Sequence, residues 1–417
     1  MKNISRQHLL YITLLILSGE AVFILPFVLA RVFRATVLDV FEINNTELGL
    51  CFSVYGIVAL FSYLFGGPLA DKFQPRKLMG TALILTALGG LVYANNPSLQ
   101  TLAILYGFWG FTTIFLFWSA MIKATRVWGG TENQGKAFGF LDGGRGLVGA
   151  LFGLLGVFVF SLFVSDSNTV LNATEQADAF QYVIYVSSAI VAFIGVLVFF
   201  FLKIDKKAEP VTLEKITFQN IKTVLRLPAV WLLMVIILCA YVGYKITDIF
   251  SLYANEVMGY SEVDAAETGT FLLFIRPVVG VLVGFLADRS RASIYLCFGF
   301  LLSIVGALLF ASGILGEGEN VLFFLSIIVT AVGVYAARVL YFAVLQEGNI
   351  PLLFTGTAVG IISFIGYTPD IFAGPAIGYF LDASPGESGH QAVFWMLAIF
   401  SAVGFVASFI FYRISKR

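Results

Sequence analysis

Ionisable side chains stand in the middle part of long apolar runs at five positions of this 417-residue chain: Glu20, Lys245, Asp248, Arg276 and Asp370. An ionised side chain at the centre of a bilayer costs roughly 2.5–3.5 kcal/mol on insertion scales, which makes each one a functional candidate. An arginine fork binds a planar carboxylate, phosphate or sulfonate through two hydrogen bonds, and a carboxylate can carry a proton. These residues therefore indicate the binding of a small anion together with a proton.

We predict two sets of site residues from this chemistry. Substrate binding is assigned to Arg31, Lys245, Arg276, Tyr244 and Tyr367, and proton coupling is assigned to Glu20, Asp248 and Asp370. Two alternatives stay open. Lys245 and Asp248 are spaced i, i+3 and could form a self-contained ion pair. Arg31 lies in the outer third of its run and could extend to the membrane interface.

Prolines support two of these assignments, because Pro277 follows Arg276 and Pro369 precedes Asp370. A proline removes a backbone donor and frees a carbonyl, which is tolerated where a kinked helix lines a cavity. Arg276 also has no opposite charge within one helical turn. We therefore expect Arg276 and Asp370 to line a polar cavity.

The composition is that of a membrane protein. The chain is 59% hydrophobic and only 12% charged, whereas soluble domains carry about 25% charged residues. Its mean hydropathy is +0.93. The net charge is zero and no basic arm is present, so nothing indicates nucleic-acid binding. Three cysteines inside apolar runs and only two histidines predict no disulfide framework, metal site or cofactor.

Twelve apolar runs approach the length of about 20 residues that a spanning helix needs. They cover residues 9–34, 47–70, 78–96, 100–123, 137–163, 180–202, 229–254, 266–287, 293–314, 321–345, 355–381 and 391–412. The first run is predicted to be a retained helix, because no small-residue cleavage site follows it. Six runs lie on each side of a polar stretch. We therefore predict an N-terminal bundle (1–202), a cytoplasmic linker (203–228) and a C-terminal bundle (229–417).

Two short echoes indicate that the halves are copies of one unit. GPLADK at 67–72 returns as GFLADR at 284–289, so Asp288 follows Asp71 by 217 residues. GKAFG at 135–139 and GTAVG at 356–360 keep nearly the same offset, 221 residues. Duplicated bundles are typical of secondary transporters. The predicted fold class is an all-α membrane protein with twelve transmembrane helices in two pseudo-symmetric six-helix bundles.

Loop charges predict the orientation. One set of loops carries the Lys and Arg residues, and the alternate loops carry Asp and Glu without a single Lys or Arg. By the positive-inside rule, both termini are predicted to lie in the cytoplasm. The predicted location is the inner (cell) membrane.

The loop between the second and third runs carries a recognisable pattern. Gly67-Pro-Leu-Ala-Asp71-Lys72, followed by Arg76-Lys77, resembles the signature loop of the major facilitator superfamily. The string Asp71-Lys-Phe-Gln-Pro-Arg76 is similar to the variant in its organophosphate:phosphate antiporter, or sugar-phosphate permease, branch. The resemblance implies that this loop stabilises one of two alternating states. We assign gating to Gly67, Asp71, Lys72, Arg76 and, in the second copy, Asp288.

Physical reasons accompany this gating assignment. Gly67 would let its helix approach a neighbour closely, and Asp71 could face the N-terminus of another helix. Asp142 and Arg145 are spaced i, i+3 within Asp142-Gly-Gly-Arg-Gly146. We expect them to form an ion pair at the cytoplasmic gate, with the glycines allowing close helix packing.

These observations predict a secondary active transporter and not an enzyme. The substrate expected is a small organic anion: a sugar acid, a sugar phosphate or a related carboxylate or sulfonate. Proton symport is favoured by the three mid-span carboxylates and by Val127, which stands where the antiporter branch has a histidine. The alternative is organophosphate:phosphate antiport. A channel, an ATP-driven pump and a polytopic enzyme are disfavoured, since repeated pore segments, a Walker loop and clustered catalytic side chains are missing from the sequence. One chain holds both halves, so a monomer in the lipid bilayer is expected.

Overall fold

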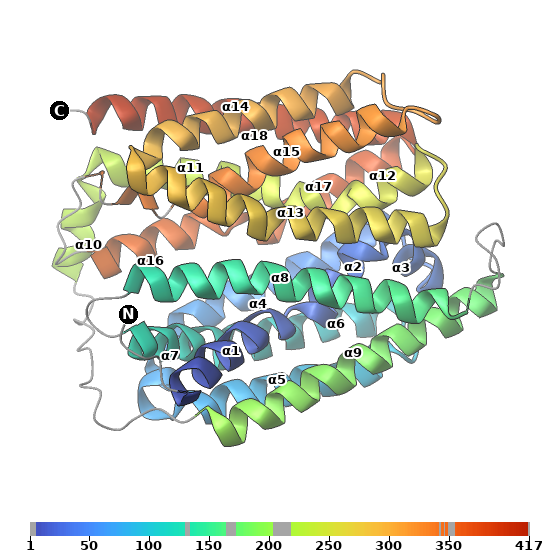
Figure 1. Ribbon diagram of the computed structural model, residues 1–417, viewed down its shortest axis with the longest axis horizontal. Helices are drawn as coiled ribbons and strands as arrows, with labels where there is room; N and C mark the ends of the chain where they lie inside the picture. Colours follow the sequence, from blue (N-terminus) through green and yellow to red (C-terminus); the bar gives the residue numbers. More distant parts are fainter. Residues whose placement is uncertain are drawn as a thin grey trace. The chain divides into compact units, whose positions relative to one another are not determined.

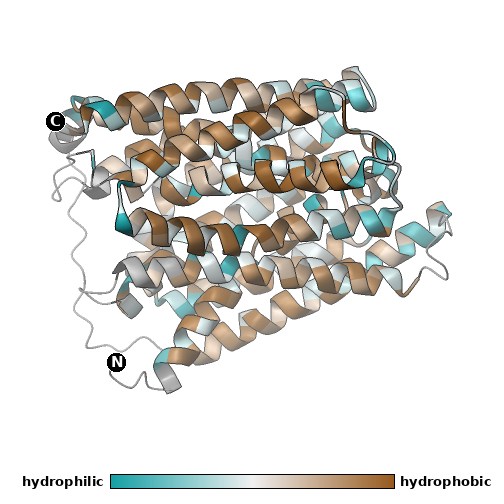
Figure 2. Ribbon diagram, turned by 45° about the horizontal axis from the view of Figure 1, so that its top comes forward, coloured by the Kyte–Doolittle hydropathy of each residue, from teal (hydrophilic) through white to brown (hydrophobic). Residues whose placement is uncertain are grey.

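The computed structural model describes residues 6–129, 134–163, 172–202, 218–341, 343–345, 347–348 and 355–415. Every regular element in this part of the chain is a helix (Figure 1). Figure 2 shows apolar residues along the middle of the helices and polar residues gathered towards their ends. Ten helical runs among these residues are long and apolar enough to cross a membrane. The predicted class, an all-α membrane protein, is confirmed.

The first six predicted spans correspond to helices α1 to α9. Their bounds are α1 (Arg6–Ala21), η1 (Ile24–Val28), α2 (Leu29–Val32), α3 (Arg34–Val40), α4 (Asn45–Lys72), α5 (Pro75–Tyr93), α6 (Leu99–Gly110), η2 (Phe111–Trp118), α7 (Ser119–Gly129), α8 (Gln134–Ser161) and α9 (Ala173–Phe201). Capping boxes begin two of them: Asn44 with Glu47 starts α4, and Asn172 with Glu175 starts α9.

The remaining predicted spans correspond to α11 to α18. The bounds are α10 (Phe218–Leu225), α11 (Pro228–Ile246), η3 (Thr247–Ile249), α12 (Phe250–Glu256), α13 (Glu262–Arg289), α14 (Ala292–Ala311), α15 (Asn320–Leu340), η4 (Ala343–Leu345), α16 (Thr355–Gly366), α17 (Pro369–Ala383) and α18 (Glu387–Ile414). Two predicted spans are outside the ten apolar runs: α5, and the span at 355–381, which is divided between α16 and α17.

Contacts divide the chain into two compact units. The first unit comprises Met1–Glu209, Asp248–Asn255 and Gly259–Pro277, and the second comprises Pro210–Thr247, Glu256–Met258 and Val278–Arg417. Most of α12 and the first half of α13 therefore belong with the helices of the first unit. The division at residues 203–228 that the sequence indicates stays a prediction.

Four predicted spans change their helical form partway along. A π-helix, η1, contains Pro26 in the first span, and a second π-helix, η2, occupies the middle of the fourth. The seventh span passes through a single 3₁₀ turn, η3, and the eleventh breaks between Gly366 and Pro369. π-helical segments are rare and are found frequently at functional sites. These irregular segments flank the in-span charges described below.

Small residues set the spacing of α14 and α15, which lie side by side in the second unit (Figure 1). A Cβ added to Gly333 would lie against the backbone nitrogen of Ser303 and 2.7 Å from the carbonyl oxygen of Gly299. Backbone atoms cannot move aside as a flexible side chain can. The approach of these two helices therefore requires a glycine at this position.

Gly67 was expected to allow a similar close approach, and this expectation is wrong. A Cβ at Gly67 would meet no described heavy atom within 4 Å. The closely packed glycine is its neighbour Gly66, where a Cβ would lie 3.1 Å from the carbonyl oxygen of Phe115 and 3.3 Å from Ser119 Oγ. Successive residues of a helix face different directions, so Gly67 points away from the helix that Gly66 contacts.

We predict that Gly333→Ala lowers the stability of the purified protein by about 1–3 kcal/mol, the typical cost of overpacking. Gly67→Ala is the matched control, because the same added methyl group enters open space. Thermal unfolding in detergent measures both variants. Equal melting temperatures for Gly333→Ala and the unmodified protein would contradict the packing described here.

Candidate functional site

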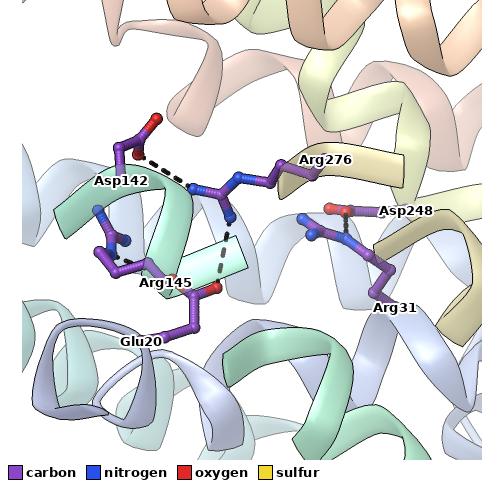
Figure 3. Close-up of polar contacts among 6 residues, drawn as sticks. All are labelled: Glu20, Arg31, Asp142, Arg145, Asp248 and Arg276. Atoms are coloured by element: carbon purple, nitrogen blue, oxygen red, sulfur yellow. Dashed lines mark hydrogen bonds and ion pairs between the residues drawn. The ribbon is translucent and has the colours of Figure 1, made fainter. Parts of the chain in front are cut away.

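Six charged residues converge within the first unit (Figure 3). They are Glu20, Arg31, Asp142, Arg145, Asp248 and Arg276, and they come from four different spans. Five of the six are buried, and the sixth, Asp142, has a side chain that is 49% exposed. Burial of this many charges is tolerated only where each has an opposite charge within reach.

Four of these residues form a cluster, here called the inner cluster: Glu20, Asp142, Arg145 and Arg276. The two terminal nitrogens of Arg276 lie 3.5 Å from Glu20 Oε1 and 3.3 Å from Asp142 Oδ1. Arg145 Nε donates to the other oxygen of Glu20 at 3.1 Å. Two guanidinium groups thus face two carboxylates, and the inner cluster has no net charge. Arg276 has no opposite charge within one turn of its own helix, and its two partners come from other helices, α1 and α8.

Glycines make the room for this cluster. A Cβ at Gly19 would lie 3.1 Å from Arg145 Cδ, and a Cβ at Gly149 would lie 3.2 Å from Glu20 Oε1. Each of the two packed helices therefore leaves space for the charged side chain of the other. Gly146 allows α8 to reach the Arg276–Pro277 segment, because a Cβ there would be 3.1 Å from Pro277 Cδ. Close packing by the glycines after Asp142 is confirmed at this position.

Aromatic rings at the two π-helices surround Arg145. Its guanidinium carbon lies 5.5 Å from the ring centroid of Phe23 and 5.7 Å from that of Trp118. Phe23 immediately precedes η1, and Trp118 is the last residue of η2. Contacts at these distances stabilise a cation through the ring face. The irregular helical segments thus present flat, apolar surfaces beside the inner cluster.

Arg31 and Asp248 form a separate buried pair. Arg31 Nε donates to Asp248 Oδ1 at 2.5 Å, and the two side chains are only 3% and 7% exposed. Ser251 Oγ donates to the backbone oxygen of Arg31. Extension of Arg31 to the interface is therefore wrong. The two residues are 217 positions apart in the sequence, so the pair joins distant segments of the chain.

A third ion pair lies in the second unit. Lys245 Nζ is 3.2 Å from Asp370 Oδ1, and the hydroxyl of Tyr241 donates to both oxygens of Asp370 at 3.0 and 3.1 Å. The self-contained pair of Lys245 and Asp248 is wrong. It assumed one continuous α-helix, but α11 ends at Ile246 and a 3₁₀ turn follows. Asp370 stands in the first turn of α17, where the helix dipole favours a carboxylate.

Tyrosines gather around this third pair. The ring of Tyr241 lies 4.9 Å from Tyr367 and 5.8 Å from Tyr244 by centroid. The hydroxyl groups of Tyr341 and Tyr367 are 3.2 Å apart, and Arg338 places its guanidinium carbon 3.7 Å from the centroid of Tyr244. The predicted residues Tyr244 and Tyr367 thus lie together with Lys245 and Asp370.

Three members of this tyrosine cluster are not among the residues assigned to substrate binding: Tyr241, Tyr341 and Arg338. A signal existed for two of them, because Tyr241 precedes Lys245 by one helical turn and Arg338 is itself a charge within an apolar run. The position of Tyr341 depends on how α15 ends, which the sequence pattern leaves open.

The predicted gating residues lie at helix ends. Lys72 is the exposed last residue of α4, and Arg76 Nε donates to Gln74 Oε1 in the following loop at 3.0 Å. Asp71 and Asp288 belong to α4 and α13, and their side chains are outside the described part of the structure. Lys123 Nζ donates to the carbonyl oxygen of Ala70 at 2.7 Å and so caps the end of α4.

Asp142 and Arg145 were expected to pair with each other at a gate. The structure joins Asp142 to Arg276 and Arg145 to Glu20 instead. A gating role for these two residues stays a prediction. No group of three or more His, Cys, Asp or Glu side chains that could hold a metal occurs among the described residues.

Comparison with known proteins was made on the whole chain. Residues 10–373 match the family model described as Major Facilitator Superfamily. The inner membrane protein YqcE of Escherichia coli (strain K12) is 30% identical over 423 residues, covering 100% of this chain and 97% of that protein. The inner membrane protein YihN of the same strain is 27% identical, covering 97% and 96%.

Solved structures share the fold at low identity. A bacterial homologue of the human lysosomal transporter Spinster, crystallised in an inward-facing and unoccupied conformation, aligns with a TM-score of 0.73 at 16% identity, covering 98% of both chains. The nucleoside transporter NupG aligns with a TM-score of 0.69 at 14% identity, covering 99% of this chain and 100% of that one. These likenesses concern the fold alone.

We predict that Arg31→Asp and Asp248→Arg each destabilise the protein by about 3–5 kcal/mol, because each leaves a buried charge facing its like. The double exchange, which restores an opposite pair, should recover at least half of that loss. Thermal unfolding of the three variants in detergent measures the coupling. A double variant no more stable than the single ones would show that the pair contributes no specific interaction.

Proposed function

The chain belongs to the Major Facilitator Superfamily, and from that premise we propose that it is a proton-coupled symporter of a small organic anion. Members of this family are multi-pass membrane transporters that work by alternating access. One observation carries the finer proposal. Each of the three carboxylates assigned to proton coupling lies against one of the three cations assigned to substrate binding.

The pairing supplies a physical basis for coupling in the inner cluster. When Glu20 takes a proton, Arg145 and Arg276 face only one remaining carboxylate, that of Asp142. The inner cluster then carries one uncompensated positive charge, which is costly away from water. A substrate anion removes that cost by binding the freed guanidinium groups. Proton and anion thereby favour each other, and either one alone leaves an unbalanced charge.

The same reasoning applies to Lys245 and Asp370 in the second unit. A proton on Asp370 would remove the negative charge beside the Lys245 ammonium, which would then attract an anion, while Tyr241 keeps a hydrogen bond to the protonated carboxyl group. The surrounding tyrosine rings offer apolar faces and hydroxyl groups at one place. This combination suits a hydroxylated acid of sugar size, with an apolar ring face and an acidic group.

The alternative proposal is exchange of an organophosphate for inorganic phosphate. Glu20 pairs with two arginines, Arg145 and Arg276. This arrangement favours the alternative, because a phosphate dianion can accept hydrogen bonds from two guanidinium groups. In that mechanism phosphate on the opposite side, and not the proton gradient, would drive uptake.

We also propose the orientation and the working unit. Both termini are cytoplasmic, because the loops on that side carry the Lys and Arg residues. A monomer carries out transport, since one chain holds both predicted halves of the cavity.

Uptake into proteoliposomes tests the proposed function. We expect one class among hexuronates, sugar phosphates, sulfonates and monocarboxylates to accumulate under an inward proton gradient and to lose accumulation on addition of a protonophore. Uptake that trans phosphate drives regardless of the pH gradient would establish exchange instead. Flux that fails to saturate would point to a channel.

A pair of variants tests the assigned residues. We expect Arg276→Gln to weaken substrate affinity tenfold or more, about 1.4 kcal/mol, because it removes a charge-assisted bond to the anion. Glu20→Gln mimics the protonated state, so it should retain counterflow yet lose accumulation driven by the proton gradient. The controls are Arg226→Gln and Asp178→Asn, which make the same chemical changes at exposed positions. Unaltered substrate affinity in Arg276→Gln, with normal folding, would remove Arg276 from the site.

A further inference from the structure

A groove unrelated to the charged clusters lies between α14 and α18 in the second unit. Its walls are Ile294, Cys297, Phe298 and Leu301 from α14, with Phe405, Phe409 and Tyr412 from α18, and its volume is about 320 Å³. The side chains of Phe298, Leu301 and Phe409 are each more than two fifths exposed. In a membrane protein, an exposed apolar groove along two spanning helices faces the acyl chains of the bilayer.

Two arginines stand at one end of this groove. Arg291 immediately precedes α14 and Arg413 lies in the last turn of α18. The two helices run antiparallel, as the hydrogen bond from Arg291 to the backbone oxygen of Ser415 shows. Arg291 places its guanidinium carbon 5.0 Å from the ring centroid of Tyr412, and Arg413 places its own 5.1 Å from that of Phe409. Both rings are walls of the groove, so the two cations lie beside its walls.

The described side chains at this end carry a net positive charge. Glu347 lies 3.6 Å from Arg291 Nε and also accepts hydrogen bonds from the backbone and side chain of Ser293. Of the side chains described at this end, two guanidinium groups thus face one carboxylate. The side chain of Arg291 is still 32% exposed, and Arg413 is exposed. A guanidinium group binds phosphate oxygens in fork geometry, and basic pockets between spanning helices bind anionic headgroups.

We propose that this groove binds an anionic phospholipid, with one acyl chain along α14 and α18 and its phosphate held by Arg291 and Arg413. The apolar walls account for the chain, and the arginines over Tyr412 and Phe409 account for the headgroup. A soluble phosphate has no acyl chain to contact the apolar walls. A zwitterionic lipid carries a cationic group, which the arginines would repel. The site is independent of the transported substrate.

Native mass spectrometry of the delipidated full-length protein tests the headgroup. We expect phosphatidylglycerol to bind at least fivefold more than phosphatidylcholine with the same chains. The double variant Arg291→Gln with Arg413→Gln should lower phosphatidylglycerol binding to the level of phosphatidylcholine. Arg289→Gln is the matched control, because Arg289 packs over Phe285 on α13, which is not one of the rings that line the groove. Equal binding of the two lipids, or unchanged binding by the double variant, would overturn the proposal.

Two further measurements test the acyl chain. Leu301→Trp fills the groove and should reduce the binding of phosphatidylglycerol, with a thermal melt to show that the variant folds. Cys297 lines the groove and is half-buried, whereas Cys51 and Cys239 are buried, so phosphatidylglycerol should slow the maleimide labelling of Cys297 in the unmodified protein. If glycerol phosphate competes as strongly as the lipid, the site binds the anion alone and the acyl chain contributes nothing, which would contradict the proposal. Unchanged labelling of Cys297 would also overturn the proposal.

Discussion

The cost of holding a charge away from water is the constraint on which this structure depends. Three buried carboxylates, Glu20, Asp248 and Asp370, each lie against a cation from a different helix. Removing one member of such a pair leaves the other uncompensated, and that loss exceeds the small net gain of forming the pair. The helices must therefore be arranged so that opposite charges meet at one depth. Glycines such as Gly19 and Gly149 let the helices approach closely enough for this to occur.

Irregular helical segments place these charges at the required depth. Glu20 lies just before a π-helix, Asp248 lies in a 3₁₀ turn, and Asp370 lies in the first turn of a new helix after a break. A continuous α-helix fixes the direction of each side chain at 100° per residue, which leaves little choice of neighbour. A local change of helical form rotates the residues that follow. The third pair, in the second unit, depends on two such changes, one beside Lys245 and the other beside Asp370.

Much of the fold could be predicted from the sequence, because each spanning helix is specified locally by an apolar run of sufficient length. The irregularity at residues 366–369 also follows from a local signal, Pro369. Ion-pair partners are a different matter, since they depend on which helices are neighbours and on how each one is rotated. Arg276 had no opposite charge within a turn, yet two carboxylates from other helices reach it. Gly67 and Gly66 differ by one position, and only the three-dimensional structure shows which of them faces a neighbouring helix.

The pair of Arg31 and Asp248 has a consequence for the order in which the chain assembles. The two residues are 217 positions apart in the sequence, so synthesis completes the span that contains Arg31 long before it reaches Asp248. An ionised side chain in the apolar core of a membrane is costly until an opposite charge meets it. The first span therefore gains its full stability only after the segment around Asp248 has packed against it. Folding of the first unit cannot be completed by the N-terminal spans alone, because residues 248–255 belong to that unit.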